Sequence, residues 1–169
     1  MFDTEVEKNQ VILCVSSEGS FYVSRSEILK ALKLTGNNIC YVGFSKPYQA
    51  LKNELTEFPS IFYIDTLTMS VQMPPHVDDC FFVQAPNALT DLSVAISKVM
   101  SEKGPSNIFF DSLSSLLLYQ DSHTLIKFLH NLINKVRVLN VKIVFVVLQK
   151  DAKSDLVKDL CMFVDIVVN

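Results

Sequence analysis

The sequence predicts an α/β fold in which helices cover both faces of a central, mainly parallel β-sheet. Short apolar runs rich in Val, Ile, Phe and Tyr recur along the chain, and most are separated by longer segments with helical spacing. Strand, helix and strand at this spacing need crossover connections, which join parallel strands. The apolar content of 49% and the mean hydropathy of +0.29 agree, because strands covered on both faces are apolar throughout. We therefore expect a three-layer α/β/α arrangement.

The apolar runs are predicted to be strands because of their length and their β-branched and aromatic content. They cover residues 11–15, 38–44, 61–65, 80–84, 107–111, 142–149 and 163–168. The cleanest charge-free run, Ile143 to Leu148, is far shorter than the ~18 residues that a membrane span needs. We therefore expect no membrane-spanning segment.

Helical periodicity marks the longer segments between the runs. They cover residues 24–34, 46–57, 88–102 and 122–139. In the last of these, Leu125, Leu129, Leu132 and Val136 fall on one stripe, with lysines and asparagines on the other side. The 3.6-residue period holds there for about five turns, so this is the clearest helix in the chain.

Length and charge limit the classes of function. The 169 residues suit one domain, 1–169, since domains typically hold roughly 100–200 residues. The net charge is −3 and no Lys/Arg block forms a stripe, so we expect neither a nucleic-acid partner nor an anionic membrane partner. The start, MFDTEVEKNQ, is polar and acidic, which does not fit a signal peptide.

The cysteines favour a cytoplasmic protein. Cys14, Cys40, Cys80 and Cys161 are widely spaced, and no C-x-x-C pair exists. Each lies in or beside an apolar stretch, so buried, reduced thiols are expected rather than a disulfide framework or a metal site. The longest irregular segment, 66–79, follows a predicted strand end, where functional loops of open α/β sheets tend to lie.

The stretch VILCVSSEGSFYVSRSEI runs from a strand through a Gly/Ser loop into a helix start, the place of a phosphate-binding loop in many α/β proteins. Such a loop reads G-x-x-x-x-G-K-[ST]. On that spacing Gly19 and Ser26 fit, Ser24 replaces the second glycine, and Arg25 replaces the lysine. Ser24 and Glu27 form an S-x-x-E capping box, which predicts that the helix begins just after Ser24 and favours this register. The planar guanidinium of Arg25 brings charge but does not replace a compact ammonium.

A second register begins the motif at the strand end, with Ser16 first. It puts Phe21, Tyr22 and Val23 where Gly-Lys-Ser would lie. Neither register restores the lysine. Three interpretations stay open: a strand-to-helix turn with no ligand, which we favour, a residual anion site, and a loop that supports hydrolysis.

A second candidate residue ends the strand NIFFD. Asp111 is followed by Ser112. A carboxylate at that position can hold Mg²⁺ or its water, as a Walker-B aspartate does. An aspartate at a strand end can equally cap a turn or the next helix, and the pattern does not distinguish the two roles.

The chain resembles the RecA/KaiC-like ATPase superfamily, and more closely the small KaiC-related domain proteins of archaea. The matching phrases are NICYVGFSKPYQALKNEL, APNALTDLSVAISKVM, NIFFDSLSSLLLY, FLHNLINKVRVLNVKIVFVVLQKDA and LCMFVDIVVN. They occur in the expected order and cover most of the chain after about residue 38. The resemblance implies a RecA-like P-loop NTPase fold. It also implies nucleotide bound across the carboxyl ends of the strands, often between neighbouring subunits of a ring.

The resemblance carries over poorly to catalysis. Active relatives have a glutamate near the end of the second strand that activates the attacking water, whereas the matching phrase here, 44–47, reads FSKP. Asp111 matches the Walker-B position, and Gln149 matches either a sensor of the third phosphate or a strand-end cap, which we favour. The vestigial nucleotide-binding residues are then Gly19, Arg25, Ser26, Asp111, Ser112 and Gln149.

Hydrolysis of ATP depends on a lysine, Mg²⁺ and a group that orients water, and two of these three are missing. We therefore expect a degenerate domain without catalytic residues, cofactor or metal. It would act as a regulatory or scaffold protein through contacts with a protein partner or with copies of itself. The alternative is a nucleotide-binding switch or weak ATPase that takes ATP and Mg²⁺ through Arg25, Ser26 and Asp111.

Overall fold

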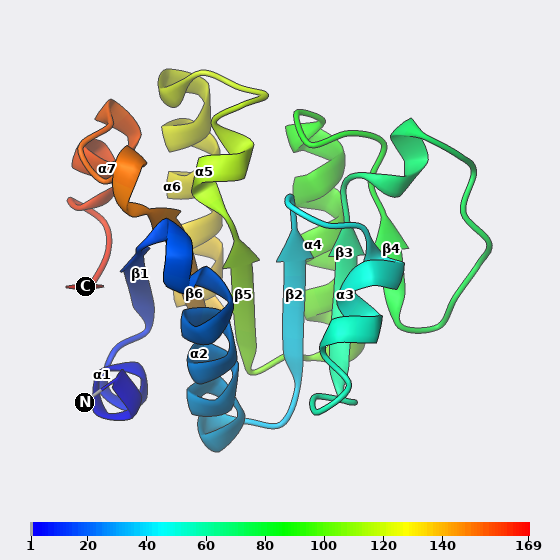
Figure 1. The fold of residues 1–169 in the computed structure, drawn as a ribbon, viewed down its shortest axis with the longest axis horizontal. Coiled ribbons are helices and arrows are strands. Elements are labelled where there is room, and N and C mark those ends of the chain that lie inside the picture. Colours follow the sequence, from blue (N-terminus) through cyan, green and yellow to red (C-terminus); the bar gives the residue numbers. More distant parts are fainter. Residues whose placement is uncertain (1) are drawn as a thin grey trace.

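The computed structural model describes residues 2–169 and contains a seven-stranded sheet in the order β4-β3-β2-β5-β6-β1-β7 (Figure 1). The strands are β1 (Val11–Ser16), β2 (Ile39–Gly43), β3 (Ile61–Asp65), β4 (Cys80–Phe82), β5 (Asn107–Asp111), β6 (Lys142–Leu148) and β7 (Ile166–Val168). Every pairing in this sheet is parallel. The predicted parallel sheet is confirmed.

Helices cover both faces of the sheet. They are α1 (Phe2–Lys8), α2 (Phe21–Thr35), α3 (Tyr48–Glu54), α4 (Leu89–Lys103), α5 (Leu113–Leu116), α6 (Ser122–Val138) and α7 (Asp155–Leu160). Helices α1 to α3 supply one buried apolar cluster, and α4 to α7 supply the other. Figure 1 shows α2 and α3 in front of the sheet and α4 and α6 behind it. The predicted three layers are therefore present.

Strand β2 shows how the two clusters share the sheet. Cys40 and Val42 belong to the cluster under α4 and α6, whereas Ile39 and Tyr41 belong to the cluster under α2 and α3. Successive side chains of a strand point to opposite faces, so both sets are buried. This arrangement explains why the predicted strands read as continuous apolar runs.

The sequence patterns missed the short helices α1, α5 and α7. Helix α1 is held by contacts from distant parts of the chain: Val6 is fully buried, and Lys142 Nζ donates to the main-chain carbonyls of Val6 and Asn9. The strand predicted over 163–168 is shorter than expected and begins at Ile166. The Asp165 carboxylate, just before it, accepts hydrogen bonds from the main-chain N–H groups that open β1.

The connections leave neighbouring strands toward opposite faces at two places. Strand β1 leads to α2 and its neighbour β6 leads to α7, while β2 leads to α3 and its neighbour β5 leads to α5. Open α/β sheets bind ligands at such places, outside the carboxyl ends of the strands. Within residues 2–169, no helix is both long and apolar enough to cross a bilayer.

Candidate functional site

The connection from β1 to α2 is four residues long and contains one glycine. Residues Glu18–Ser20 form a single 3-10 turn, and α2 begins at Phe21. A Cβ built on Gly19 would meet nothing within 4 Å, so the loop does not need a glycine for close approach. The prediction that this helix begins after Ser24 with a capping box is wrong.

The earlier helix start follows from packing. Phe21 packs against the apolar cluster beneath α2, and this burial stabilises helical backbone from the first turn. Ser24 therefore lies inside the helix, where its Oγ accepts a hydrogen bond of 3.2 Å from Ser16 Oγ. The observed start fits the second register, which puts Phe21 and Tyr22 where a phosphate loop has Gly-Lys.

Arg25 and Ser26 are bonded to groups on the α3 side of α2. Arg25 is 6% exposed, and its Nη2 donates to Glu54 Oε2 over 3.0 Å. Its Nε is buried and has no hydrogen-bond partner among the described residues. Ser26 Oγ donates to Glu57 Oε1 over 3.3 Å. Arg25, which the first register aligns with the lysine of a phosphate loop, is thus paired with a carboxylate of the same chain.

Lys46 joins the same group of side chains. Its Nζ donates to Glu54 and lies 4.6 Å from the centre of the Tyr22 ring, while the Arg25 guanidinium carbon lies 5.1 Å from that centre. The hydrogen bond with Glu54 raises the pKa of Lys46, and the same bond lowers the pKa of Glu54. Lys46 lies in the stretch 44–47 after β2, which the resemblance aligns with the catalytic glutamate of active ATPases. This chain therefore has a cation where a carboxylate is expected.

Asp111 lies at the carboxyl end of β5, opposite Gly43 of β2, and is 1% exposed. Tyr41 Oη donates to Asp111 Oδ2, and Ser45 Oγ donates to Oδ1 over 3.4 Å. Burial raises the pKa of Asp111 to about 6, although the hydrogen bond from Tyr41 and the charge of Arg25 favour the ionised form. Both carboxylate oxygens therefore have partners inside the protein.

Ser112 and Gln149 occupy different environments. Ser112 caps α5, because its Oγ accepts a 3.2 Å hydrogen bond from the Ser115 N–H. Gln149 is exposed on a turn after β6, and the end of that strand is held by Ser114, whose Oγ accepts a 2.8 Å bond from the Leu148 N–H. Whether Gln149 contacts a phosphate stays a prediction.

Of the residues predicted to form the site, the structure brings Asp111, Ser112 and Arg25 to one region. The other three lie elsewhere: Ser26 is bonded to Glu57, Gly19 is in the exposed loop before α2, and Gln149 is on the turn after β6. The sequence reasoning missed the partners Tyr41 and Glu54. The sequence did contain a signal that Tyr41 could be a partner of Asp111. Tyr41 carries the one hydroxyl in the otherwise apolar strand 39–43, and it lies two residues before Gly43, which is paired with Asp111. Residues two apart on a strand share a face.

Large apolar side chains are exposed in the connections that follow β1, β3 and β5. They are Tyr22, Val23, Val71, Met73, Leu118 and Tyr119. These connections leave the carboxyl edge of the parallel sheet, the same edge that holds Asp111. Large apolar side chains that are exposed at one edge of the sheet can anchor a contact with another macromolecule.

Comparison with solved structures shows a KaiC-like protein with the same fold. The crystal structure of KaiC-like protein PH0186 from the hyperthermophilic archaeon Pyrococcus horikoshii OT3 superposes with a TM-score of 0.68. The match covers 94% of this chain and 70% of that chain, at 13% sequence identity. The similarity confirms the RecA/KaiC-like fold that the resemblance predicted.

No curated protein matches this sequence. A family model does match, over residues 64–169, and it carries the description "Family of unknown function (DUF7504)". The matched segment runs from the end of β3 to the last residue and includes Asp111, Ser112 and Gln149. The chain belongs to this family, DUF7504, and has a RecA/KaiC-like fold.

Proposed function

We propose that this chain is a RecA/KaiC-like domain that does not hydrolyse ATP and acts in the cytoplasm as a regulatory or scaffold protein through protein–protein contacts. One observation carries the proposal. The two groups that would serve a triphosphate and its metal ion, Arg25 and Asp111, are bonded to Glu54 and Tyr41 instead.

The chemistry of phosphoryl transfer explains why these bonds matter. Catalysis there is positioning plus stabilisation of charge, supplied by a cation, Mg²⁺ and a residue that orients water. The loss of a single donor typically costs on the order of 10²–10³ in rate. In this chain the helix after β1 starts with Phe21 and Tyr22, where a phosphate loop has its glycine and lysine. The nearby cation, Arg25, is already paired with Glu54. More than one contribution to the stabilisation of the transition state is therefore missing.

The exposed apolar side chains support the second half of the proposal. Tyr22 and Leu118 are 56% and 77% exposed, in connections that leave the carboxyl edge after β1 and β5. Aromatic and large aliphatic groups are the usual anchors of protein interfaces. A partner protein or another copy of the chain that covered this edge would bury them.

An ATPase assay tests the proposal. Purified protein with ATP and Mg²⁺ is expected to release no more phosphate than the Asp111→Asn variant. Turnover that needs Mg²⁺, is lost in Asp111→Asn and is kept in the exposed control Asp91→Asn would contradict it.

Thermal unfolding in the same buffers separates the alternative from the proposal. A ligand that binds the native state raises the melting temperature by mass action. The proposal expects a flat response across millimolar ATP with Mg²⁺. A saturable rise without turnover would favour the nucleotide-binding switch instead.

A further inference from the structure

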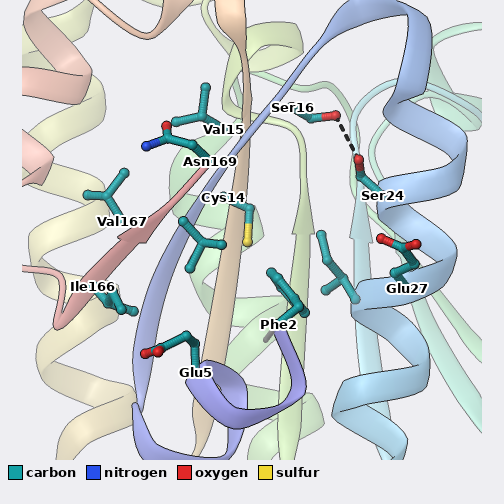
Figure 2. A pocket seen from close by; sticks show the side chains of 12 residues that line it. Phe2, Glu5, Cys14, Val15, Ser16, Ser24, Glu27, Ile166, Val167 and Asn169 are labelled. Carbon is teal, nitrogen blue, oxygen red and sulfur yellow. Dashed lines mark hydrogen bonds between the residues drawn. The ribbon is translucent and has the colours of Figure 1, made fainter.

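A partly open cleft of about 570 Å³ lies at the β7 edge of the sheet, on the face covered by α1 and α2 (Figure 2). Its walls come from the start of α1, the end of β1, the second turn of α2 and strand β7. Strand β7 pairs with β1 and is the outermost strand on this side of the sheet that residues 2–169 form, so the cleft adjoins the outer edge of β7. Such an edge offers main-chain groups that can pair with another segment.

The floor of the cleft is apolar. Cys14 and Ile28 are almost fully buried beneath it, while Phe2, Ile166 and Val168 are half-buried and line it. Burial raises the pKa of the Cys14 thiol to about 12, so this group is uncharged at neutral pH. An occupant therefore gains most by placing apolar side chains on this floor.

The charge at the rim has one sign. Glu5 and Glu27 line the cleft, and among the described residues that line it there is no lysine, arginine or histidine. Neither carboxylate forms an ion pair with the described residues, although Asn9 Nδ2 donates to Glu5 Oε2 over 3.3 Å. Figure 2 shows the two glutamates on opposite sides, with Phe2 and Cys14 between them.

We propose that this cleft is the docking site for a segment of a partner protein that presents apolar side chains flanked by lysine or arginine. The apolar floor takes the apolar side chains, and Glu5 and Glu27 pair with the flanking cations. This inference rests on the proposed function, because it names a surface through which a regulatory or scaffold domain makes its contacts. Anionic ligands are disfavoured by the two unpaired carboxylates.

A fluorescent peptide with leucines flanked by lysines is the probe, and the same peptide with glutamates in place of the lysines is its control. Fluorescence anisotropy with the full chain is expected to give saturable binding of the lysine peptide that weakens with salt. The glutamate peptide is not expected to bind. Amide NMR shifts caused by the lysine peptide are expected at residues 14–16, 24–28 and 166–168.

Matched variants test the two carboxylates. Glu5→Gln and Glu27→Gln are each expected to weaken binding of the lysine peptide about two- to fivefold, as for exposed ion pairs. Glu102→Gln on α4, on the other face of the sheet, removes the same charge and is expected to change nothing. The glutamine variants keep an acceptor at Glu5, so folding is preserved, which amide NMR spectra check.

Two outcomes overturn the inference. The first is an equal loss of affinity in all three variants, which reports net charge alone. The second is a set of NMR shifts that lies outside the cleft or is missing altogether. ATP turnover, by contrast, would overturn the proposed function without affecting this binding measurement, so the two failures are distinguishable.

Discussion

Two aspartates end parallel strands of this sheet, and they differ in their partners. Asp65, at the end of β3, is 2% exposed and accepts hydrogen bonds from the N–H groups of Tyr48, Leu67 and Thr68 and from the Thr68 hydroxyl. These donors belong to the turn that follows β3 and to the start of α3. Asp65 therefore fixes two connections of the main chain.

Asp111, at the end of β5, is equally buried but bonds to side-chain hydroxyls of Tyr41 and Ser45. Its pKa is raised to about 6, chiefly by burial. The same sequence pattern, an apolar strand that ends in Asp, thus gives one aspartate that accepts hydrogen bonds from main-chain N–H groups and another that accepts them from side-chain hydroxyls near Arg25. Environment, rather than position on the strand, decides which role each can take.

The largest expected effect is on Asp65. Asp65→Ala leaves several main-chain N–H groups without their acceptor, each at a cost of about 1–3 kcal/mol where they are buried. We expect the free energy of unfolding to fall by roughly 3 kcal/mol or more, measured by urea denaturation. The exposed control Asp91→Ala is expected to stay within about 0.5 kcal/mol of the parent. A loss for Asp65→Ala no larger than for the control would refute the role of Asp65 in the turn.

The next effect is the pH dependence that Asp111 imposes. Its pKa is about 6 in the folded chain, against about 4 in an unfolded chain, so the folded state holds the proton between these values. Its stabilising contribution is present below about pH 4 and is lost as the pH rises through 6. The free energy of unfolding should therefore fall by roughly 2–3 kcal/mol relative to the Asp111→Asn variant over that window.

Urea denaturation of both proteins at a series of pH values measures this difference, because other titrating groups cancel between parent and variant. A difference that stays constant from pH 4 to pH 7 would show that Asp111 has an ordinary pKa. The comparison between the two aspartates would then rest on hydrogen bonds alone.

Tyr41→Phe is expected to have a smaller effect. It removes the donor to Asp111 Oδ2 from a fully buried site, so we expect a loss of about 1–2 kcal/mol in the free energy of unfolding at neutral pH. The hydrogen bond favours the ionised carboxylate, so the pKa of Asp111 should rise further in the variant. NMR titration of the Asp111 carboxyl carbon checks this, and an unchanged or lower pKa would contradict it.

Glu54→Gln is expected to have the smallest effect. The Glu54 side chain is 34% exposed, and glutamine keeps an oxygen that can accept a hydrogen bond from the buried guanidinium of Arg25. We therefore expect the free energy of unfolding to fall by about 1 kcal/mol. Glu57→Gln, on the more exposed neighbour, serves as the control. Equal losses in the two variants would mean that burial of Arg25 adds nothing to its pair with Glu54.

The sheet was predictable because its strands are buried on both faces and therefore read as unbroken apolar runs. The start of α2 was not, because it depends on the packing of Phe21 against side chains from distant strands. A capping box at Ser24 is a local signal, and tertiary burial overrode it. Helix α1 was missed for the same reason. It is stabilised by the burial of Val6 and by hydrogen bonds from Lys142, which is distant in the sequence.

The candidate site was predictable only in part. Asp111 and Ser112 stand out at a strand end, but their partners are set by which strands become neighbours. Tyr41 reaches Asp111 because β2 and β5 are adjacent, and 70 positions separate the two residues in the chain. The partner of Arg25 lies on α3, and no local pattern in the sequence indicates that pairing.

Arg25 and Asp111 are hydrogen-bonded to partners within the chain, and we propose that they do not serve a triphosphate. Amide NMR of the full chain titrated with ATP and Mg²⁺ tests this proposal. We predict no saturable shift at Gly19, Ser20 and Phe21, and none at Asp111 and Ser112. Saturable shifts at both places that need Mg²⁺, together with loss of the Arg25–Glu54 ion pair, would contradict the claim.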